Sequence, residues 1–255
     1  MIMSDMFSLE GRRFLITGGT RGIGRAMAIG FAAAGAAVIA NYVRDVRSAK
    51  ALQSEADKAG YAIELCRADL TSTKGLERLR LVLDASDAGL DGLIHCAATG
   101  VHNTLEELTI RHFDWTFALN VRAFFELVTL VSPRLNTGAS IIAMSSAGAA
   151  RAVYSYSVIG SSKGALESLA RHMAREFAPR GIRVNIIRAG SVLTDAWASM
   201  PDGEKRIEEA IRRSPVGRLV TADEVARAAQ FLCSDAAAGI VGHTLVVDGG
   251  EGIVE

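Results

Sequence analysis

The sequence predicts an α/β fold, a single doubly wound parallel sheet of seven strands with helices on both faces. Short apolar runs rich in β-branched residues alternate with longer segments of helical period, as expected of βαβ units. Hydrophobic residues make up 49% of the chain and charged residues 22%, which supplies enough apolar material for a sizeable core. No linker-like tract, charge block or internal repeat divides the chain. We therefore expect one domain over residues 1–255.

Each predicted strand is short, apolar and bounded by Gly, Asp, Asn or Ser, which is typical of buried parallel strands. The strands are expected at residues 13–17, 37–41, 63–68, 92–96, 140–145, 183–188 and 244–247. Between them, Ala and Leu repeat at three and four residues, which predicts helices. The helices are expected at residues 22–34, 46–58, 73–84, 113–135, 157–177 and 222–234.

Residues 192–214 carry weak strand and helix signals, and the tripeptide at 201–203 is typical of a turn. Because this insertion lies between the sixth strand and the last helix, we expect it to form a substrate lid.

Composition excludes several kinds of partner. Lys and Arg total 28 and Asp and Glu total 28, so no net field favours nucleic acid or an anionic membrane. The three cysteines are widely spaced, which favours free thiols in a reducing cytoplasm. No apolar run is long enough to span a bilayer, and the histidines form no ligand-spaced cluster. We expect a cytoplasmic protein without a metal or a membrane span.

Three glycines lie where the first predicted strand passes into the first predicted helix. Gly18 permits a tight turn, Gly22 lets the backbone approach a pyrophosphate, and Gly24 lets helix and strand pack closely. The helix N-terminus adds N–H donors and positive potential for a phosphate. A glycine-rich turn without a ligand is the alternative, but the flanking strand and helix favour a Rossmann-type dinucleotide site. The other turn residues expected at the cofactor are Thr20, Arg21 and Ile23.

The turn reads GxxxGxG after Thr17, and in this the sequence resembles the short-chain dehydrogenase/reductase family. The resemblance spans nearly the whole chain and includes Asp69–Leu70, Asn120, Ser145–Ser146, Lys163, Val184–Asn185 and residues 247–250. It implies that Asp69 and Leu70 flank the adenine. It also implies cofactor contacts from Cys96, Ala97 and Ala98 at the adenine ribose, and from Gly190, Val192 and Thr194.

The chain departs from the family pattern after its fourth and sixth strands. His95–Cys96–Ala97–Ala98 stands where the family usually has Asn-Asn-Ala-Gly, and Ala189–Gly190 replaces Pro-Gly. We expect His95 to have a structural role.

The end of the second strand indicates which nicotinamide cofactor binds. An acidic residue there accepts a hydrogen bond from the ribose 2′-hydroxyl of NAD, whereas Arg accommodates the 2′-phosphate of NADP. The strand runs into Arg44, and Arg21 lies in the glycine turn, so both guanidinium groups can pair with a phosphate. These residues favour NADPH, although Asp45 follows directly.

The spacing of a tyrosine and a lysine bears on the reaction. Most family members carry Tyr-x-x-x-Lys, but Ile159 stands four residues before Lys163. Tyr156 precedes the lysine by seven residues, and two helical turns take about 7.2 residues, so Tyr156 faces the lysine's side further along the axis. Tyr-x6-Lys resembles the NADPH-dependent enoyl-acyl carrier protein reductases of the family. An enoyl reductase must stabilise an enolate oxygen several bonds from the carbon that takes the hydride.

On this resemblance, Tyr156 hydrogen-bonds the thioester carbonyl and stabilises the enolate, while Lys163 binds the nicotinamide ribose. Ser146 stands where family members place a substrate-binding serine, and a plain strand-end hydroxyl is its alternative. Asn120 is implied to hold a helix kink near the lysine. Tyr154 points away from the lysine's face but can still line the pocket.

The resemblance implies reduction of an enoyl thioester, carried by acyl carrier protein or CoA, in fatty-acid synthesis. An NADPH-dependent ketoreductase or alcohol dehydrogenase that uses Tyr156 or Tyr154 is the alternative. A dinucleotide-binding regulator without turnover is a further one, motivated by the absent Tyr at 159 and Asn at 95. The two long helices pair across subunits in this family, which implies a homotetramer.

Overall fold

The computed structural model describes residues 6–194 and 203–254, and every structural statement below refers to these residues. Their strands form one seven-stranded parallel sheet in the order β3-β2-β1-β4-β5-β6-β7. The strands are β1 (Arg13–Thr17), β2 (Ala37–Tyr42), β3 (Ile63–Arg67), β4 (Leu90–His95), β5 (Leu135–Ser146), β6 (Arg183–Ala189) and β7 (Thr244–Val247). The predicted fold class is confirmed.

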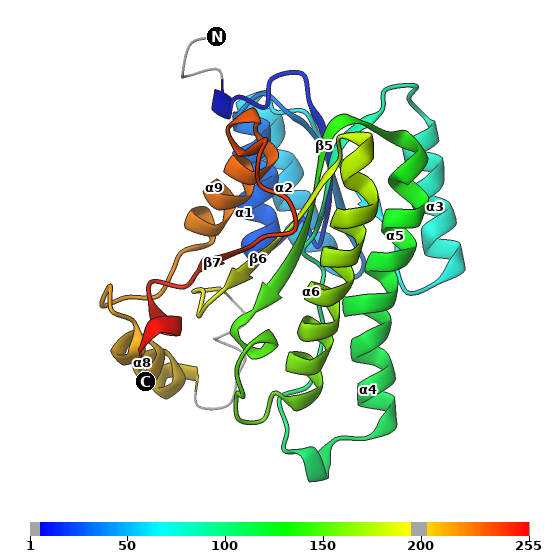
Figure 1. Cartoon of the computed structure of the whole chain (residues 1–255). Coiled ribbons are helices and arrows are strands. Elements are labelled where there is room, and N and C mark those ends of the chain that lie inside the picture. Colours follow the sequence, from blue (N-terminus) through cyan, green and yellow to red (C-terminus); the bar gives the residue numbers. More distant parts are fainter. Residues whose placement is uncertain (1–5, 195–202, 255) are drawn as a thin grey trace.

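Helices cover both faces of the sheet (Figure 1). The first face carries α1 (Gly22–Ala33), α2 (Val46–Ala59) and α9 (Ala222–Cys233), and the second carries α3 (Thr73–Asp84), α5 (Ala123–Val131) and α6 (Ser157–Phe177). Each face buries its own apolar cluster against the strands, which is why the strands are apolar on both sides. Several helices begin at predictable caps, since the side chains of Asp45, Ser72 and Thr221 accept backbone N–H bonds.

The order of the strands fixes where a ligand can bind. The chain moves outward from β1 through β2 to β3 and then returns to β4 on the other side of β1. Helices of the two faces therefore separate between β1 and β4, and a crevice opens beyond the carboxyl ends of these two strands. Figure 1 shows the arrowheads of β5 and β6 pointing toward this end of the molecule, where α8 and the C-terminus also lie.

The predicted continuous helix at 113–135 is wrong. The structure has α4 (Ile110–Phe117), a π-helical turn (Ala118–Arg122) and α5, and residue 135 already begins β5. The apolar spacing runs through all three pieces, so it could not show the extra residue per turn that a π-helix inserts. The strand predicted at 140–145 begins earlier, at Leu135, and the other predicted boundaries agree or shift by one or two residues.

The weak signals at 192–214 hid a helix, α8 (Gly203–Arg213). Its exposed face is rich in Glu, Lys and Arg, so the segment has too few apolar residues for a helical period to be recognised from the sequence. Part of the predicted lid, residues 195–202, lies outside the described residues, so the lid stays a prediction. Among the helices that the structure describes, none is long and apolar enough to cross a membrane. All three cysteines are free thiols.

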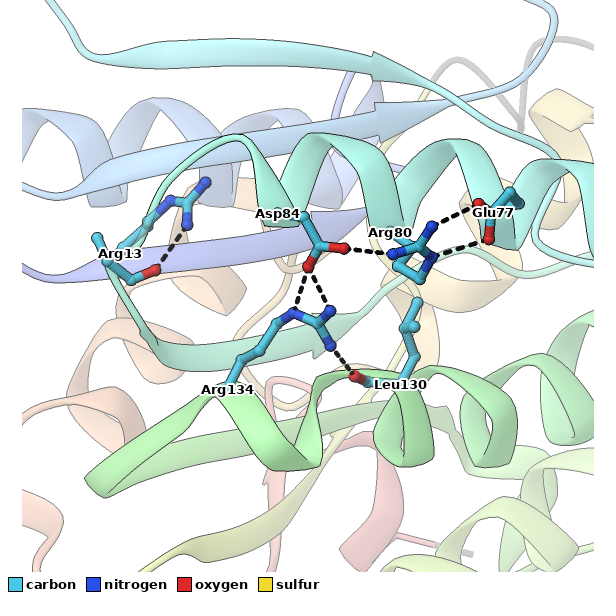
Figure 2. Close-up of polar contacts among 7 residues, drawn as sticks. Arg13, Glu77, Arg80, Asp84, Leu130 and Arg134 are labelled. Atoms are coloured by element: carbon cyan, nitrogen blue, oxygen red, sulfur yellow. Dashed lines mark hydrogen bonds and ion pairs between the residues drawn. The ribbon is translucent and has the colours of Figure 1, made fainter.

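A network of ion pairs ties the elements together at the opposite edge of the sheet. Asp84 at the end of α3 binds Arg80 at 2.6 Å and also binds Arg134, which follows α5 (Figure 2). Arg134 in turn donates to the carbonyl of Leu130 at 2.9 Å. Because strands β4 and β5 begin at this edge, the network is remote from the crevice.

Candidate active site

The glycine turn connects β1 to α1 as predicted. Gly18 has a φ of +63° and Gly22 a φ of +52°, which favour glycine. A Cβ on Gly24 would lie 2.1 Å from the carbonyl oxygen of Gly18, so any side chain there would push the helix off the strand. Arg21 precedes α1 and its side chain does not cap the helix. The first-turn N–H groups therefore lack a side-chain acceptor from this position, which suits an anionic ligand.

The structure brings several predicted cofactor residues against this turn. The Thr17 hydroxyl accepts hydrogen bonds from the backbone N–H groups of Cys96 at 3.1 Å and Ala97 at 3.0 Å. A Cβ on Gly18 would lie 3.1 Å from the Cα of Ala97. Across the turn, a Cβ on Gly22 would lie 3.5 Å from Cγ2 of Thr194. The segments after β1, β4 and β6 thus meet at the predicted phosphate site.

The remaining cofactor candidates lie on the same edge of the sheet. Gly190 donates its N–H to Val247 at 3.0 Å, and Val192 forms an isolated parallel bridge with Val220. The carboxylate of Asp69 accepts from the N–H and hydroxyl of Thr71, which holds the chain after β3. Side chains of two candidates, Thr20 and Leu70, are buried, whereas Ala98 is exposed and Ile23 half-buried.

The carboxylate of Asp45 is already engaged. Its oxygens accept from the Ser48 N–H at 2.9 Å and the Ser48 hydroxyl at 2.7 Å, so Asp45 caps α2. These hydrogen bonds lower the pKa of Asp45, and the positive charge of Arg21 lowers it further. Arg21 therefore lies near the chain that follows β2, and it lines the same cavity as Ser48. The adjoining Arg44 is exposed there.

A cavity of about 600 Å³ adjoins the glycine turn. Its wall includes Arg21, Gly22 and Thr194, but it extends outward along α1 and α2 to Glu55. Tyr156 and Lys163 do not line it. The cavity therefore borders the proposed phosphate site and is separate from the proposed reaction centre.

Tyr156 and Lys163 converge on the carboxyl end of β5. The Tyr156 hydroxyl donates to Oγ of Ser146 at 3.2 Å, and Nζ of Lys163 donates to the carbonyl of Met144 at 2.8 Å. The Lys163 side chain is buried and the Tyr156 side chain is half-buried. Burial raises the pKa of Tyr156 and lowers the pKa of Lys163 to about 8. Tyr156 precedes α6 and is not part of the helix. The predicted direction of its side chain, which assumed helical spacing from Lys163, is therefore only approximate.

Ile159 takes up the space where most family members have a tyrosine. It is 6% exposed, and its Cγ1 lies only 2.2 Å from where a Cβ on Gly100 would be. The ring of Tyr156 lies against a second glycine, since a Cβ on Gly148 would be 2.5 Å from Cδ1 of the ring. Tyr154 is 82% exposed and has no comparable enclosure. Tyr156 is thus the phenol that the described residues hold beside Ser146.

Asn120 lies in the π-helical turn and joins two segments of the site. Its Oδ1 accepts from the N–H of Thr99 at 2.9 Å, and its Nδ2 donates to the Thr99 carbonyl at 3.0 Å and the Ser162 hydroxyl at 2.9 Å. Since Ser162 directly precedes Lys163, Asn120 positions the lysine's helix against the chain that follows β4.

His95 is buried and supports the same turn. Burial lowers its pKa to about 3, so the ring is neutral. Nε2 donates to the Leu119 carbonyl at 3.2 Å, which leaves Nδ1 to accept from the Thr17 hydroxyl at 3.2 Å. His95 therefore links the glycine turn to the π-helical turn, a task that its position at the end of β4 alone did not indicate.

Sequence reasoning missed two buried carboxylates near the site. Glu167 lies one turn beyond Lys163 and accepts from the Ser145 hydroxyl at 2.7 Å and from Arg188 at 2.7 Å. Glu251, near the C-terminus, is also buried and bonds residues of three other segments. A signal for Glu167 existed in its i, i+4 spacing from Lys163, but no comparable signal marked Glu251.

Comparisons with known proteins agree with this architecture. Residues 18–251 match a family model described as enoyl-(acyl carrier protein) reductase. The chain is 35% identical to 1-cyclohexenylcarbonyl-CoA reductase of Streptomyces collinus over 94% of its length and 86% of that protein.

Two solved structures are also similar. A putative NAD(P)-dependent gluconate 5-dehydrogenase of Beutenbergia cavernae with bound NADP has a TM-score of 0.91, with 31% identity over 98% of this chain and 100% of that one. A 7α-hydroxysteroid dehydrogenase complexed with NADH and a 7-oxo bile acid has a TM-score of 0.91, with 33% identity over 98% of both chains. The chain belongs to the short-chain dehydrogenase/reductase family of oxidoreductases.

Proposed function

We propose that this oxidoreductase uses NADPH to reduce the 2,3 double bond of an enoyl thioester. The observation that carries the proposal is the enclosed Tyr156 hydroxyl beside Ser146, combined with a buried Ile159 four residues before Lys163. The phenol therefore stands at the residue before α6, three residues earlier in the chain than position 159, where most family members have theirs. An enolate oxygen also lies further from the hydride-accepting carbon than a ketone oxygen does.

The residues around the glycine turn fit a dinucleotide. The close approach of Gly24 to the Gly18 carbonyl supports a turn that wraps a pyrophosphate, and the uncapped start of α1 supplies N–H donors. Arg21 and Arg44 would hold the 2′-phosphate, because the Asp45 carboxylate is committed to Ser48 and does not serve as the ribose acceptor. We therefore propose that the chain prefers NADPH to NADH.

When bound, the nicotinamide supplies a hydride. Lys163 would hold the nicotinamide ribose, exchanging its bond to the Met144 carbonyl for ribose hydroxyls. With a pKa of about 8 its ammonium group is still protonated at neutral pH, so it adds positive potential beside the reacting atoms.

The Tyr156 hydroxyl would donate a hydrogen bond to the thioester carbonyl oxygen in place of its hydrogen bond to Ser146. The raised pKa of Tyr156 keeps the phenol protonated and able to donate. A hydrogen bond that strengthens as negative charge develops on the oxygen lowers the barrier to reduction. Asn120 and His95 touch no reacting atom in this scheme and hold the surrounding turns.

A ketoreductase or alcohol dehydrogenase is the second candidate. The hydrogen bond between Tyr156 and Ser146 favours it, since a serine and a tyrosine that share a proton can equally polarise a ketone. The bile-acid enzyme among the similar structures acts on an alcohol and ketone pair by its name. The two candidates differ in which substrate oxidises NADPH.

The deciding experiment compares crotonyl and acetoacetyl thioesters, on both CoA and acyl carrier protein, with NADPH and then NADH. We expect turnover with crotonyl thioester and NADPH. Tyr156→Phe should lower kcat by about 10²-fold or more, the usual loss when a donor to a developing oxyanion is removed. Tyr154→Phe is the matched control and should keep its activity because that side chain is exposed. NADPH oxidation with acetoacetyl thioester alone would refute the first candidate.

We also propose that the chain forms a homotetramer through α6 and through α4 and α5, which occupy the region of the predicted helix at 113–135. Large apolar side chains lie exposed on these helices, namely Phe113, Trp115 and Phe125. An exposed set of aromatic residues supports a subunit contact. Sedimentation equilibrium on the wild-type chain would test it, and a monomer at micromolar concentration would oppose it.

A further inference from the structure

Glu251 is a buried carboxylate that the proposed reaction does not use. Its side chain is about 6% exposed, and it carries four contacts from other segments. Arg151 donates to Oε1 at 2.8 Å, and Nη2 of Arg213 lies 3.5 Å from the same oxygen. Ser191 donates to Oε2 from its hydroxyl at 3.1 Å and from its N–H at 3.3 Å. A buried charge destabilises the folded chain unless it is paired. The Glu251 carboxylate is therefore expected to keep these partners in contact with it.

The partners come from three segments that border the proposed site. Arg151 belongs to the loop that connects β5 to Tyr156, and Ser191 precedes the predicted cofactor residue Val192. Arg213 is the last residue of α8. Figure 1 shows α8 beside the C-terminal turn at the end of the molecule to which β5 and β6 point. One carboxylate thus joins the loop before the tyrosine, the cofactor segment and the helix of the insertion.

The turn that carries Glu251 is itself held firmly. Asp248 accepts from the N–H groups of Gly250 at 2.9 Å and Gly252 at 2.8 Å. Gly249 packs on the residues after α8, since a Cβ there would lie 2.8 Å from Cγ2 of Val216. The backbone of Val216 also donates to the Gly249 carbonyl at 3.3 Å. A rigid turn lets the Glu251 carboxylate act as a fixed anchor for the two arginines.

We infer that Glu251 is a positioning residue for the acyl side of the site. Through Arg213 it holds the end of α8, and through Arg151 it holds the loop that precedes Tyr156. The end of α8 and this loop, which we take as the two walls of the acyl site, therefore keep a fixed separation. The inference rests on the proposed function only in taking the acyl group to bind between these walls. It predicts a defect in substrate use while NADPH binding stays nearly unchanged.

The test uses Glu251→Gln, Arg213→Ala and the double variant in the full-length protein. Glu251→Gln keeps the size and the bonds to Ser191 but loses the charge. A hydrogen bond to a charged group contributes enough to change a binding constant about tenfold or more, so kcat/KM for crotonyl thioester should fall about tenfold, mainly through KM. The NADPH dissociation constant should stay within about twofold. Because both single variants break the same link, the double variant should be no worse than Glu251→Gln.

Hydrogen–deuterium exchange provides a readout that does not depend on turnover. The amides at 207–213 should exchange faster in Glu251→Gln and in Arg213→Ala than in the wild type. Asp84→Asn is the matched control, since that carboxylate also binds two arginines but lies at the opposite edge of the sheet (Figure 2). It should leave kcat/KM and α8 exchange unchanged.

Several results would overturn the inference. If the losses in kcat/KM of the two single variants multiply in the double variant, Glu251 and Arg213 act independently. If the exchange of the α8 amides is unchanged, Glu251 does not hold the helix. If Glu251→Gln does not fold, Arg213→Ala alone decides, because it removes one exposed partner. If the wild type reduces no enoyl thioester, the proposed function fails, and α8 exchange still decides on Glu251.

Discussion

Replacing Lys163 with Met should make the folded chain more stable while it abolishes turnover. Lys163 is 5% exposed, and burial lowers its pKa from 10.5 to about 8. The unfolded chain therefore binds the lysine proton more tightly than the folded chain does. Below pH 8 the lysine is charged in both states and the folded state bears the full desolvation cost. Between pH 8 and 10.5 the cost declines, so wild-type stability should rise with pH over this window.

The pKa difference sets the size of the effect. One pKa unit corresponds to about 1.4 kcal/mol, so the lowered pKa of Lys163 costs the folded state roughly 3 kcal/mol at pH 7. Methionine is similar in length and uncharged, but it loses the hydrogen bond to the Met144 carbonyl, which contributes about 1 kcal/mol. The net gain is about 2 kcal/mol, or roughly 4–8 °C in Tm for a chain of this size.

Thermal unfolding of both proteins at pH 7.0, 8.0, 9.0 and 9.5 measures the effect, because these values cover roughly the first half of the range from pH 8 to 10.5 in which wild-type stability should rise. The advantage of Lys163→Met should be largest at pH 7.0 and should shrink toward pH 9.5 as the wild type sheds its cost. Lys163→Arg serves as the control, since guanidinium stays charged and should gain nothing. A variant that is less stable than the wild type at pH 7.0, or a difference that does not change with pH, would refute the reasoning.

Three further predictions concern the glycine contacts and the cofactor. Gly24→Ala would place a Cβ 2.1 Å from the Gly18 carbonyl and should cost about 1–3 kcal/mol and weaken NADPH binding, measured by nucleotide fluorescence; native affinity would contradict it. Gly100→Ala should destabilise by about 1–3 kcal/mol through its clash with Ile159, and Ile159→Ala should cost less in that background than alone. Additive losses in chemical denaturation would rule out that contact. Arg44→Ala should raise the KM for NADPH about tenfold and leave the KM for NADH unchanged, and an equal rise for both would refute a 2′-phosphate role.

Local signals predicted the parts of the fold that depend on short stretches of chain. The glycine turn was readable because Gly18, Gly22 and Gly24 each meet a backbone requirement next to a strand and a helix. The strands were readable because strands buried on both faces must be apolar along their whole length. The π-helical turn at Asn120 was not, since apolar spacing continues through it and the turn depends on His95 and Thr99 from another segment.

The candidate site divides in the same way. Lys163 and Tyr156 stand out from their spacing, but their convergence on Ser146 and the Met144 carbonyl required the end of β5 to lie beside α6. The enclosure of Tyr156 by Gly148 likewise joins residues that no sequence pattern relates.

The sequence by itself determined the family, the parallel sheet and the nicotinamide dinucleotide class of cofactor, because each follows from local geometry and apolar pattern. Only the tertiary structure decided that Asp45 is committed to Ser48, that His95 supports a turn, and that Glu251 joins Arg151 and Arg213. These outcomes depend on burial and on partners up to a hundred residues away. A side chain's partner and exposure are properties of the packed chain, so no local pattern encodes them.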